Sequence, residues 1–208
     1  MTGLVLFDLD DTLVDRSAAF RRWAAELCAD RSLPAGAFEW LLAADRSEGF
    51  FAAVRARFGL VDDVWAQYRR RMPELVTCRP GVLSLLTGLR AAGRRVGIVT
   101  NGHADNQLGK IRRTGLDRAV DGWAVSGELG VRKPDRALFA AAAAACGADL
   151  AGGGWMVGDN PADDIAGGRA AGLATIWIAG GRPWPRDLLP PDHTCDTVEA
   201  AAGWILPA

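Results

Sequence analysis

Short apolar runs recur along the chain and alternate with helical patterns. Five of these runs have the length and composition of buried strands, and they are Leu4–Leu9, Val96–Thr100, Trp123–Ser126, Trp155–Val157 and Ala174–Ile178. Short strands that helices separate are typical of βαβ units, whose strands run parallel. The pattern therefore predicts an α/β fold built on a parallel sheet.

Residues 16–76 contain no strand candidate. Apolar side chains recur there at helical spacing from Phe20 to Cys28, behind Ser17 as the expected N-cap, and again from Trp65 to Met72, where Pro73 is expected to end the helix. We interpret this stretch as a helical insertion over the C-terminal edge of the sheet, because it interrupts the βαβ alternation. The alternative is that these helices extend the core. The predicted domains are a core of residues 1–15 and 77–208 and a helical cap of residues 16–76.

The composition is that of an ordinary globular protein. Half of the 208 residues are hydrophobic, 24% are charged and the net charge is −1, which disfavours a nucleic acid polymer as the main partner. Four separated cysteines and two histidines disfavour a zinc cage or a disulfide framework. The first apolar run follows Met1 closely, and no run approaches the length of a membrane span. We therefore expect a cytoplasmic protein without a membrane partner.

Acidic side chains follow the first apolar run. In Phe7-Asp8-Leu9-Asp10-Asp11-Thr12, the carboxylates of Asp8 and Asp10 stand at the C-terminal end of the predicted strand. Open α/β sheets carry their reactive groups at this end of the strands. The alternative is an acidic turn that only ends the strand. Further polar groups at other strand ends favour a functional site.

Two of these polar groups come from a turn and from a rare residue type. Thr100-Asn101-Gly102 follows the second apolar run and precedes a predicted helix, whose free N–H groups suit an anion. Lys133, which with Lys110 makes up all the lysine of the chain, stands just before Pro134, where another helix is predicted to begin. A cation at a helix N-terminus opposes the helix dipole, and a bound anion between them would remove the conflict. The alternatives are an ordinary turn and a solvated lysine.

Carboxylates recur after the fourth apolar run, in Gly158-Asp159-Asn160-Pro161-Ala162-Asp163-Asp164. A helix is predicted here with Asn160 as its N-cap, so the helix dipole alone accounts for Asp163 and Asp164. Asp159, in contrast, stands at a strand end as Asp8 does. Acidic groups that converge on one crevice repel each other unless a cation holds them. Oxygen ligands without histidine or thiolate indicate Mg²⁺.

These four signals resemble the motifs of the haloacid dehalogenase-like (HAD) superfamily of hydrolases, and they stand here as Asp8-Leu9-Asp10-Asp11-Thr12, Thr100, Lys133 and Gly158-Asp159 through Asp164. The resemblance implies a doubly wound parallel sheet, a Rossmann-like core, with an all-helical cap inserted after the first motif. The stretches 99–102, 107–116 and 158–174 look most like the branch of nucleotidases and N-acylneuraminate-9-phosphatases.

The resemblance also implies hydrolysis of small phosphomonoesters through an aspartyl-phosphate. Asp8 is then expected to attack phosphorus, and Asp10 to protonate the leaving alkoxide and afterwards activate water. We expect these two carboxylates to titrate as a coupled pair.

Phosphate and metal ligands follow from the same resemblance. The phosphoryl oxygens are expected to contact the side chains of Thr100 and Lys133 and the backbone N–H groups of Asn101 and Gly102. Mg²⁺ is expected at Asp8, the Asp10 carbonyl and Asp159. Asp164 is expected to orient the ligands of the metal, although the sequence does not separate it firmly from Asp163.

Three alternatives within the fold differ in their chemistry. Dehalogenases and phosphonate-cleaving relatives lack a carboxylate at the position of Asp10, which favours a phosphatase. A sugar phosphomutase retains that carboxylate and stays open, as does a non-catalytic relative that binds a phosphorylated ligand. The substrate is expected to be a small phosphorylated metabolite, such as a nucleotide or a sugar phosphate. Side chains that could touch its leaving group, although a solvated or core position is favoured for each, are Arg16, Trp40, Arg46, Arg55, Trp65 and His103.

Overall fold

The computed structural model describes residues 3–44 and 49–206. Six strands of this described part form one parallel sheet in the order β3-β2-β1-β4-β5-β6. Their bounds are β1 Leu4–Phe7, β2 Arg95–Thr100, β3 Gly122–Val125, β4 Trp155–Gly158, β5 Ala174–Ile178 and β6 His193–Cys195. The predicted parallel α/β sheet is confirmed, and the short edge strand β6 is an addition to it.

Helices cover both faces of the sheet, which explains why β1 is an unbroken apolar run. Leu4 and Leu6 pack in a buried cluster with α9, whereas Val5 and Phe7 pack in the cluster that contains α5. Helix α5, Val82–Ala91, precedes β2. The helices after β2 are α6 Ala104–Arg113, α7 Leu116–Ala119, α8 Ser126–Leu129, α9 Arg136–Ala145, α10 Gly167–Ala170 and α11 Ala202–Ile205. Short 3₁₀ turns span Leu150–Gly152 and Glu199–Ala201, and a π-helical turn, η2, spans Pro161–Ala166.

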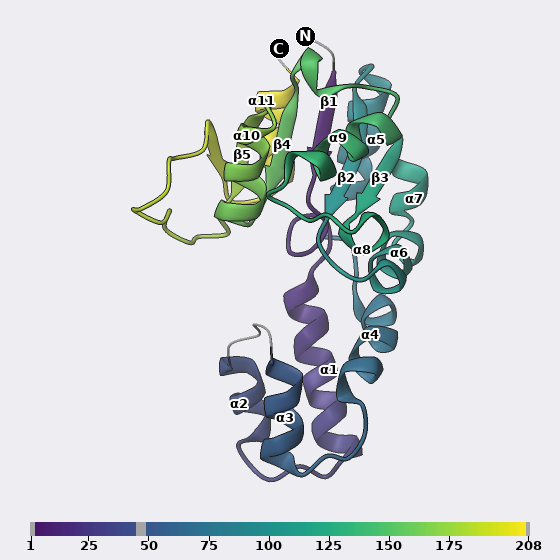
Figure 1. Cartoon of the computed structure of the whole chain (residues 1–208), viewed down its shortest axis with the longest axis vertical. Coiled ribbons are helices and arrows are strands. Elements are labelled where there is room, and N and C mark those ends of the chain that lie inside the picture. The colour runs from purple at the N-terminus through teal and green to yellow at the C-terminus, as the bar shows by residue number, and fades with distance from the viewer. Residues whose placement is uncertain (1–2, 45–48, 207–208) are drawn as a thin grey trace.

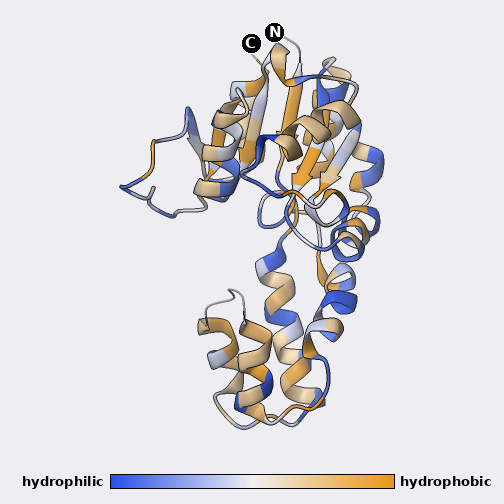
Figure 2. Ribbon diagram, viewed as in Figure 1, coloured by the Kyte–Doolittle hydropathy of each residue, from blue (hydrophilic) through white to orange (hydrophobic). Residues whose placement is uncertain are grey.

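Four helices lie beyond the carboxyl ends of the strands, and Figure 1 shows α1 and α4 leading from the sheet to α2 and α3. Their bounds are α1 Arg16–Asp30, α2 Ala37–Ala43, α3 Phe50–Phe58 and α4 Val64–Leu75. Figure 2 shows hydrophobic residues along strands of the sheet. The assignment of residues 16–76 as a separate cap domain stays a prediction.

Two predicted helix ends are wrong. The N-cap of α1 is Asp15, whose carboxylate accepts from Ala18 N at 2.8 Å, while Ser17 donates its own N–H to Asp11. Helix α4 continues through Pro73, which lacks an N–H for the carbonyl four residues earlier. That carbonyl, of Arg69, instead accepts from Asn106 Nδ2 at 2.7 Å, so α6 supplies the missing hydrogen bond.

Within the described residues, no helix combines the length and the apolar character that crossing a membrane requires.

Candidate functional site

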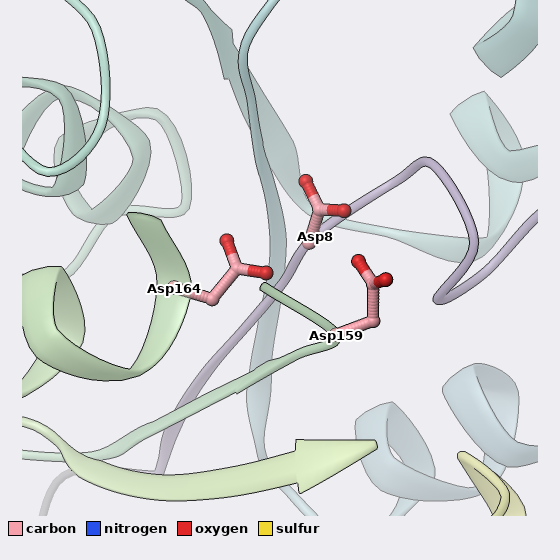
Figure 3. A group of neighbouring side chains, drawn as sticks. All are labelled: Asp8, Asp159 and Asp164. Carbon is pink, nitrogen blue, oxygen red and sulfur yellow. The ribbon is translucent and has the colours of Figure 1, made fainter. Parts of the chain in front are cut away.

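Three carboxylates meet at the carboxyl ends of β1 and β4. Asp8 follows β1 and Asp159 follows β4, and the pairing of Phe7 with Val157 sets these two strand ends side by side. Asp164 joins them from the π-helical turn η2. One carboxylate oxygen of each residue lies within 4.8 Å of the others, and Figure 3 shows the three side chains turned toward one another. The arrangement is a candidate site for a cation.

Local backbone geometry brings Asp164 into this cluster. A side chain at Gly158 would place its Cβ 2.2 Å from Asp164 Oδ2, so only glycine admits that carboxylate. Asn160 caps the turn as predicted, since its Oδ1 accepts from the N–H groups of Ala162 and Asp163. The Asn160 N–H in turn donates to Asp164 Oδ2 at 2.9 Å. Asp164 is therefore fully buried and fixed in orientation, and the structure separates it from Asp163.

Asp163 contacts a different part of the site, because its Oδ2 accepts from Asn101 Nδ2 at 3.2 Å. The Asn101 side chain also binds both backbone groups of Lys133, accepting from its N–H at 2.8 Å and donating to its carbonyl at 3.1 Å. The sequence had indicated only a role for the backbone N–H of Asn101, as a donor to phosphate. Its side chain holds the Lys133 loop against the end of β2.

Lys133 is buried between two of the three carboxylates. Its Nζ lies 2.5 Å from Asp8 Oδ1 and 2.7 Å from Asp164 Oδ1, and the residue is 2% exposed. The solvated-loop alternative is therefore wrong. The dipole argument is wrong as well, because α9 begins only at Arg136, behind Asp135 as its N-cap. Carboxylates, and not a helix terminus, determine where this ammonium lies.

The electrostatics of the cluster favour a further cation. Burial raises the pKa of Asp8, and the carboxylates of Asp164 and Asp159 raise it more, while Lys133 opposes them. Burial and the negative charge of Asp164 and Asp11 raise the pKa of Asp159 to about 6. Burial lowers the pKa of Lys133, but Asp164 and Asp8 outweigh this effect and raise it, so the ammonium stays charged. Lys133, together with Arg182, whose Nη2 lies 3.2 Å from Asp159 Oδ2, leaves the negative charge of the three carboxylates partly uncompensated.

Asp10 has a separate set of partners. Lys110 Nζ lies 2.8 Å from both of its carboxylate oxygens, and Gln107 Nε2 donates to Asp10 Oδ2 at 3.1 Å. Burial raises the pKa of Asp10, but the positive charges of Lys110 and Arg16 have the larger, opposite effect, so the pKa of Asp10 lies below its ordinary value. Asp8 and Asp10 thus each pair with a lysine of their own, and their coupled titration stays a prediction.

Sequence reasoning had not assigned Lys110 and Gln107 to the site. They stand three residues apart in α6 and thus share one face of the helix. The rarity of lysine was a signal for Lys110, since Lys133 was singled out on that ground. Gln107 Nε2 also donates to Thr100 Oγ1 at 2.7 Å, so one amide joins the end of β2 to Asp10.

The predicted phosphate ligands of β2 lie near Asp10. Thr100 is buried, with its hydroxyl bonded to Gln107. The Gly102 N–H donates to Ser126 Oγ at 2.9 Å, so it would have to change partner to bind phosphate. Phosphate binding by Thr100, Asn101 and Gly102, and metal binding by the Asp10 carbonyl, stay predictions.

Two cavities border these groups. The larger, of about 700 Å³, is lined by Asp159 and by Arg182, whose Nη2 donates to Asp159 Oδ2 at 3.2 Å. The smaller, of about 210 Å³, is lined by Asp10 and by the Asn101-Gly102 turn. Of the side chains considered for contact with a leaving group, Arg16 borders both cavities, Trp65 and His103 line the smaller one, Trp40 and Arg55 line neither, and Arg46 lies outside the described residues.

Known proteins share this sequence pattern and this fold. A family model described as haloacid dehalogenase-like hydrolase matches residues 2–172. Pyrimidine 5'-nucleotidase YjjG of Escherichia coli is 39% identical over 120 residues, which cover 57% of this chain and 53% of that protein. The chain thus matches only about half the length of that nucleotidase, whose type agrees with the predicted branch.

A second relative and a crystal structure match most of the chain. Glyceraldehyde 3-phosphate phosphatase of Pyrococcus abyssi is 31% identical over 199 residues, which cover 88% of this chain and 83% of that protein. The crystal structure of the HAD-hydrolase YfnB from Bacillus subtilis bound to magnesium superposes with a TM-score of 0.76 at 23% identity, covering 98% of both chains. At that identity the likeness concerns the fold alone.

Proposed function

The chain belongs to the haloacid dehalogenase-like hydrolases, and from this premise we propose that it is a magnesium-dependent phosphatase that hydrolyses small phosphomonoesters through a phosphorylated Asp8. The observation that carries the proposal is the position of Asp8 at the end of β1. Its carboxylate lies beside the Lys133 ammonium and within the triad completed by Asp159 and Asp164. A nucleophile, a fixed positive charge and a cation site thus adjoin one another.

The donor set of the triad suits Mg²⁺. The three groups are carboxylates, whose oxygen atoms are the ligands that Mg²⁺ prefers. The pKa values of Asp8 and Asp159 are raised in part by neighbouring negative charge, which a cation would neutralise. Asp8 and Asp159 would hold the ion, and Asp164 would orient them. When bound, magnesium would reduce the repulsion between the Asp8 carboxylate and the phosphate dianion.

The first half of the reaction forms the phosphorylated enzyme. An oxygen of Asp8 forms a bond to phosphorus, and the bond from phosphorus to the leaving oxygen breaks. Asp10, in its protonated form, donates its proton to that oxygen, which leaves as an alcohol. Lys133 stabilises the negative charge that develops on the phosphoryl group beside it.

The second half releases phosphate. Asp10, now a carboxylate, takes a proton from water as the water oxygen forms a bond to phosphorus. The bond between phosphorus and Asp8 breaks, and inorganic phosphate leaves. Lys110 and Gln107 hold Asp10 as a carboxylate in the structure, which is the form that this half requires.

We also propose that α1–α4 serve as a cap that encloses the substrate, since these helices lie beyond the strand ends and three of them, α1, α3 and α4, line the smaller cavity. The relatives named above act on a pyrimidine nucleotide and on glyceraldehyde 3-phosphate, both of them small phosphorylated metabolites. The proposed location is the cytoplasm. The free thiols at Cys28, Cys78, Cys146 and Cys195 support it, because reducing compartments keep cysteines unpaired.

Phosphate release from p-nitrophenyl phosphate with Mg²⁺ tests the proposal. Asp8→Asn should abolish turnover and the acid-stable ³²P label that the wild-type enzyme acquires from a labelled substrate. Asp163→Asn is the matched control, because Asp163 is a neighbouring carboxylate that does not belong to the triad. Equal turnover in wild type and Asp8→Asn would refute the proposal. Conversion of glucose 1-phosphate to glucose 6-phosphate without phosphate release would establish a phosphomutase instead.

A further inference from the structure

The smaller cavity differs in chemistry from one end to the other. At one end lie Asp10 and the Asn101-Gly102 turn. Helix α6 adds the polar side chains of Asn106, Gln107 and Lys110 on the same side. Three helices of the α1–α4 group and the start of α6 contribute Arg16 and six aromatic side chains, namely Phe20, Phe50, Phe51, Trp65, Tyr68 and His103. Each cation at its border already has a carboxylate partner, since Lys110 pairs with Asp10 and Arg16 with Asp11.

The aromatic walls form one connected surface around Trp65. Its ring stacks on Tyr68, with centroids 5.7 Å apart and planes 19° apart, and meets His103 edge-on at 5.3 Å. Phe51 lies 4.8 Å from Trp65 by ring centroids. Trp65, Tyr68 and Phe51 are only partly buried, whereas Phe20 and Phe50 belong to the core. Partly exposed rings around an open space can accept another ring.

The leaving group must enter this cavity if Asp10 protonates it. The acid has to lie next to the oxygen that leaves, and Asp10 lines the smaller cavity but not the larger one. The polar side chains from the core side of the cavity can contact a sugar, whereas the aromatic side chains from the α1–α4 group suit an apolar planar group. At about 210 Å³ the space is below the roughly 300–1,000 Å³ of drug-sized sites, which favours one ring over a fused system.

We propose that the substrate carries a single planar aromatic ring in its leaving group, and that this ring binds against Trp65 in the smaller cavity. The inference rests on the proposed phosphatase activity and names its substrate class. Two kinds of compound share this chemistry, pyrimidine nucleoside monophosphates and simple arylalkyl phosphates. Uridine 5′-monophosphate and benzyl phosphate represent them.

Matched substrates with and without the ring provide the test. Ribose 5-phosphate keeps the phosphate and the sugar of uridine 5′-monophosphate, and cyclohexylmethyl phosphate keeps the size of benzyl phosphate without its planarity. In the wild-type protein we expect kcat/KM to be about tenfold to a hundredfold higher for the ring-bearing member of at least one pair, as base stacking on an aromatic side chain contributes. The pair that shows the difference identifies the kind of compound. Equal kcat/KM within both pairs overturns the inference.

Variants of Trp65 connect the preference to this cavity. Trp65→Leu should lower kcat/KM for the ring-bearing member of a pair more than for its ringless partner, and so remove most of the preference for the ring. Trp65→Phe should retain most of that preference. Trp40→Leu is the control, because Trp40 lies in the same group of helices but packs on Phe58, outside the cavity. A parallel loss on both members of a pair in Trp65→Leu, with Trp65→Phe equally affected, overturns the inference. If phosphate release depends on Asp8 but is equally fast with and without the ring, the ring inference is overturned and the phosphatase proposal stands. If no substrate releases phosphate, both are overturned.

Discussion

Replacing Lys133 by methionine would remove the positive charge that the structure places in the triad while keeping an unbranched apolar side chain. The ammonium lies 2.5 Å from Asp8 Oδ1 and 2.7 Å from Asp164 Oδ1, with 2% of the residue exposed. Water therefore cannot replace it. Breaking a buried ion pair by removing one partner costs about 3–5 kcal/mol, because a charge stays buried without compensation.

The free energy of unfolding of Lys133→Met should fall by that amount in metal-free protein. The loss is reduced to the extent that Asp8 takes up a proton, since burial and its neighbours already raise its pKa. Saturating Mg²⁺ should recover part of the loss, because a divalent cation between the same carboxylates restores compensation. Urea denaturation with and without EDTA measures both effects.

The same variant should lower kcat/KM about 100- to 1,000-fold at saturating Mg²⁺, the effect of removing one fixed donor from a developing negative charge. Arg113→Met is the matched control, because Arg113 pairs with Glu74 on the surface, with 61% of its side chain exposed. An exposed pair contributes about 0–1 kcal/mol. If Lys133→Met destabilises no more than Arg113→Met, or keeps kcat/KM within about tenfold, then Lys133 does not have the role that its position indicates.

Three further predictions concern the other carboxylates. Asp10→Asn should lower kcat for alkyl phosphates by about 100- to 10,000-fold while phosphate still binds as a competitive inhibitor; undiminished turnover would mean that another acid acts. Lys110→Met should raise the pKa of Asp10, because the nearest cation is lost, so the alkaline limb of the kcat profile for an alkyl phosphate should move to higher pH; an unmoved limb would contradict this. In metal-free protein, the pKa of Asp159 is about 6 when folded against an ordinary 3.8, so the folded state holds more protons between these values and the free energy of unfolding should fall by up to about 3 kcal/mol as pH rises through them. Asp159→Asn should flatten that dependence, and urea denaturation at a series of pH values measures it.

Most of the sheet could be predicted because each central strand is an apolar run covered on both faces. Strand β6, His193–Cys195, was missed since three residues at the sheet edge give no measurable periodicity. Helix ends were harder. Ser17 and Asp15 are both good N-cap residues, and only the position of Asp11 decides between them. The continuation of α4 through Pro73 depends on Asn106, a residue of another helix.

The placement of Asp8 and Asp159 followed from one regularity, that parallel strands end at the same edge, whereas Lys133 was singled out because lysine is rare in this chain. The contacts of Lys110 and Gln107 with Asp10 could not be found in this way, because they join residues 100 and 97 positions apart through the packing of α6. Local spacing indicated that Asp8 and Asp10 would titrate as a coupled pair. Residues two apart share one side of a strand, but β1 stops at Phe7, so Asp8 and Asp10 lie beyond it and meet different surroundings.

The two lysines of the chain thus separate the charges of two carboxylates that are close in sequence. In metal-free protein the surroundings shift the pKa of Asp8 upward and the pKa of Asp10 downward. The proposed chemistry needs an ionised Asp8 and a protonated Asp10, so it needs both shifts reduced. A cation bound in the triad would favour the ionised form of Asp8, and a weaker contact with Lys110 would favour the protonated form of Asp10. Cation binding should therefore lower the pKa of Asp8 and of Asp159, whereas substrate would have to change the surroundings of Asp10, so that each ligand prepares a different carboxylate for reaction.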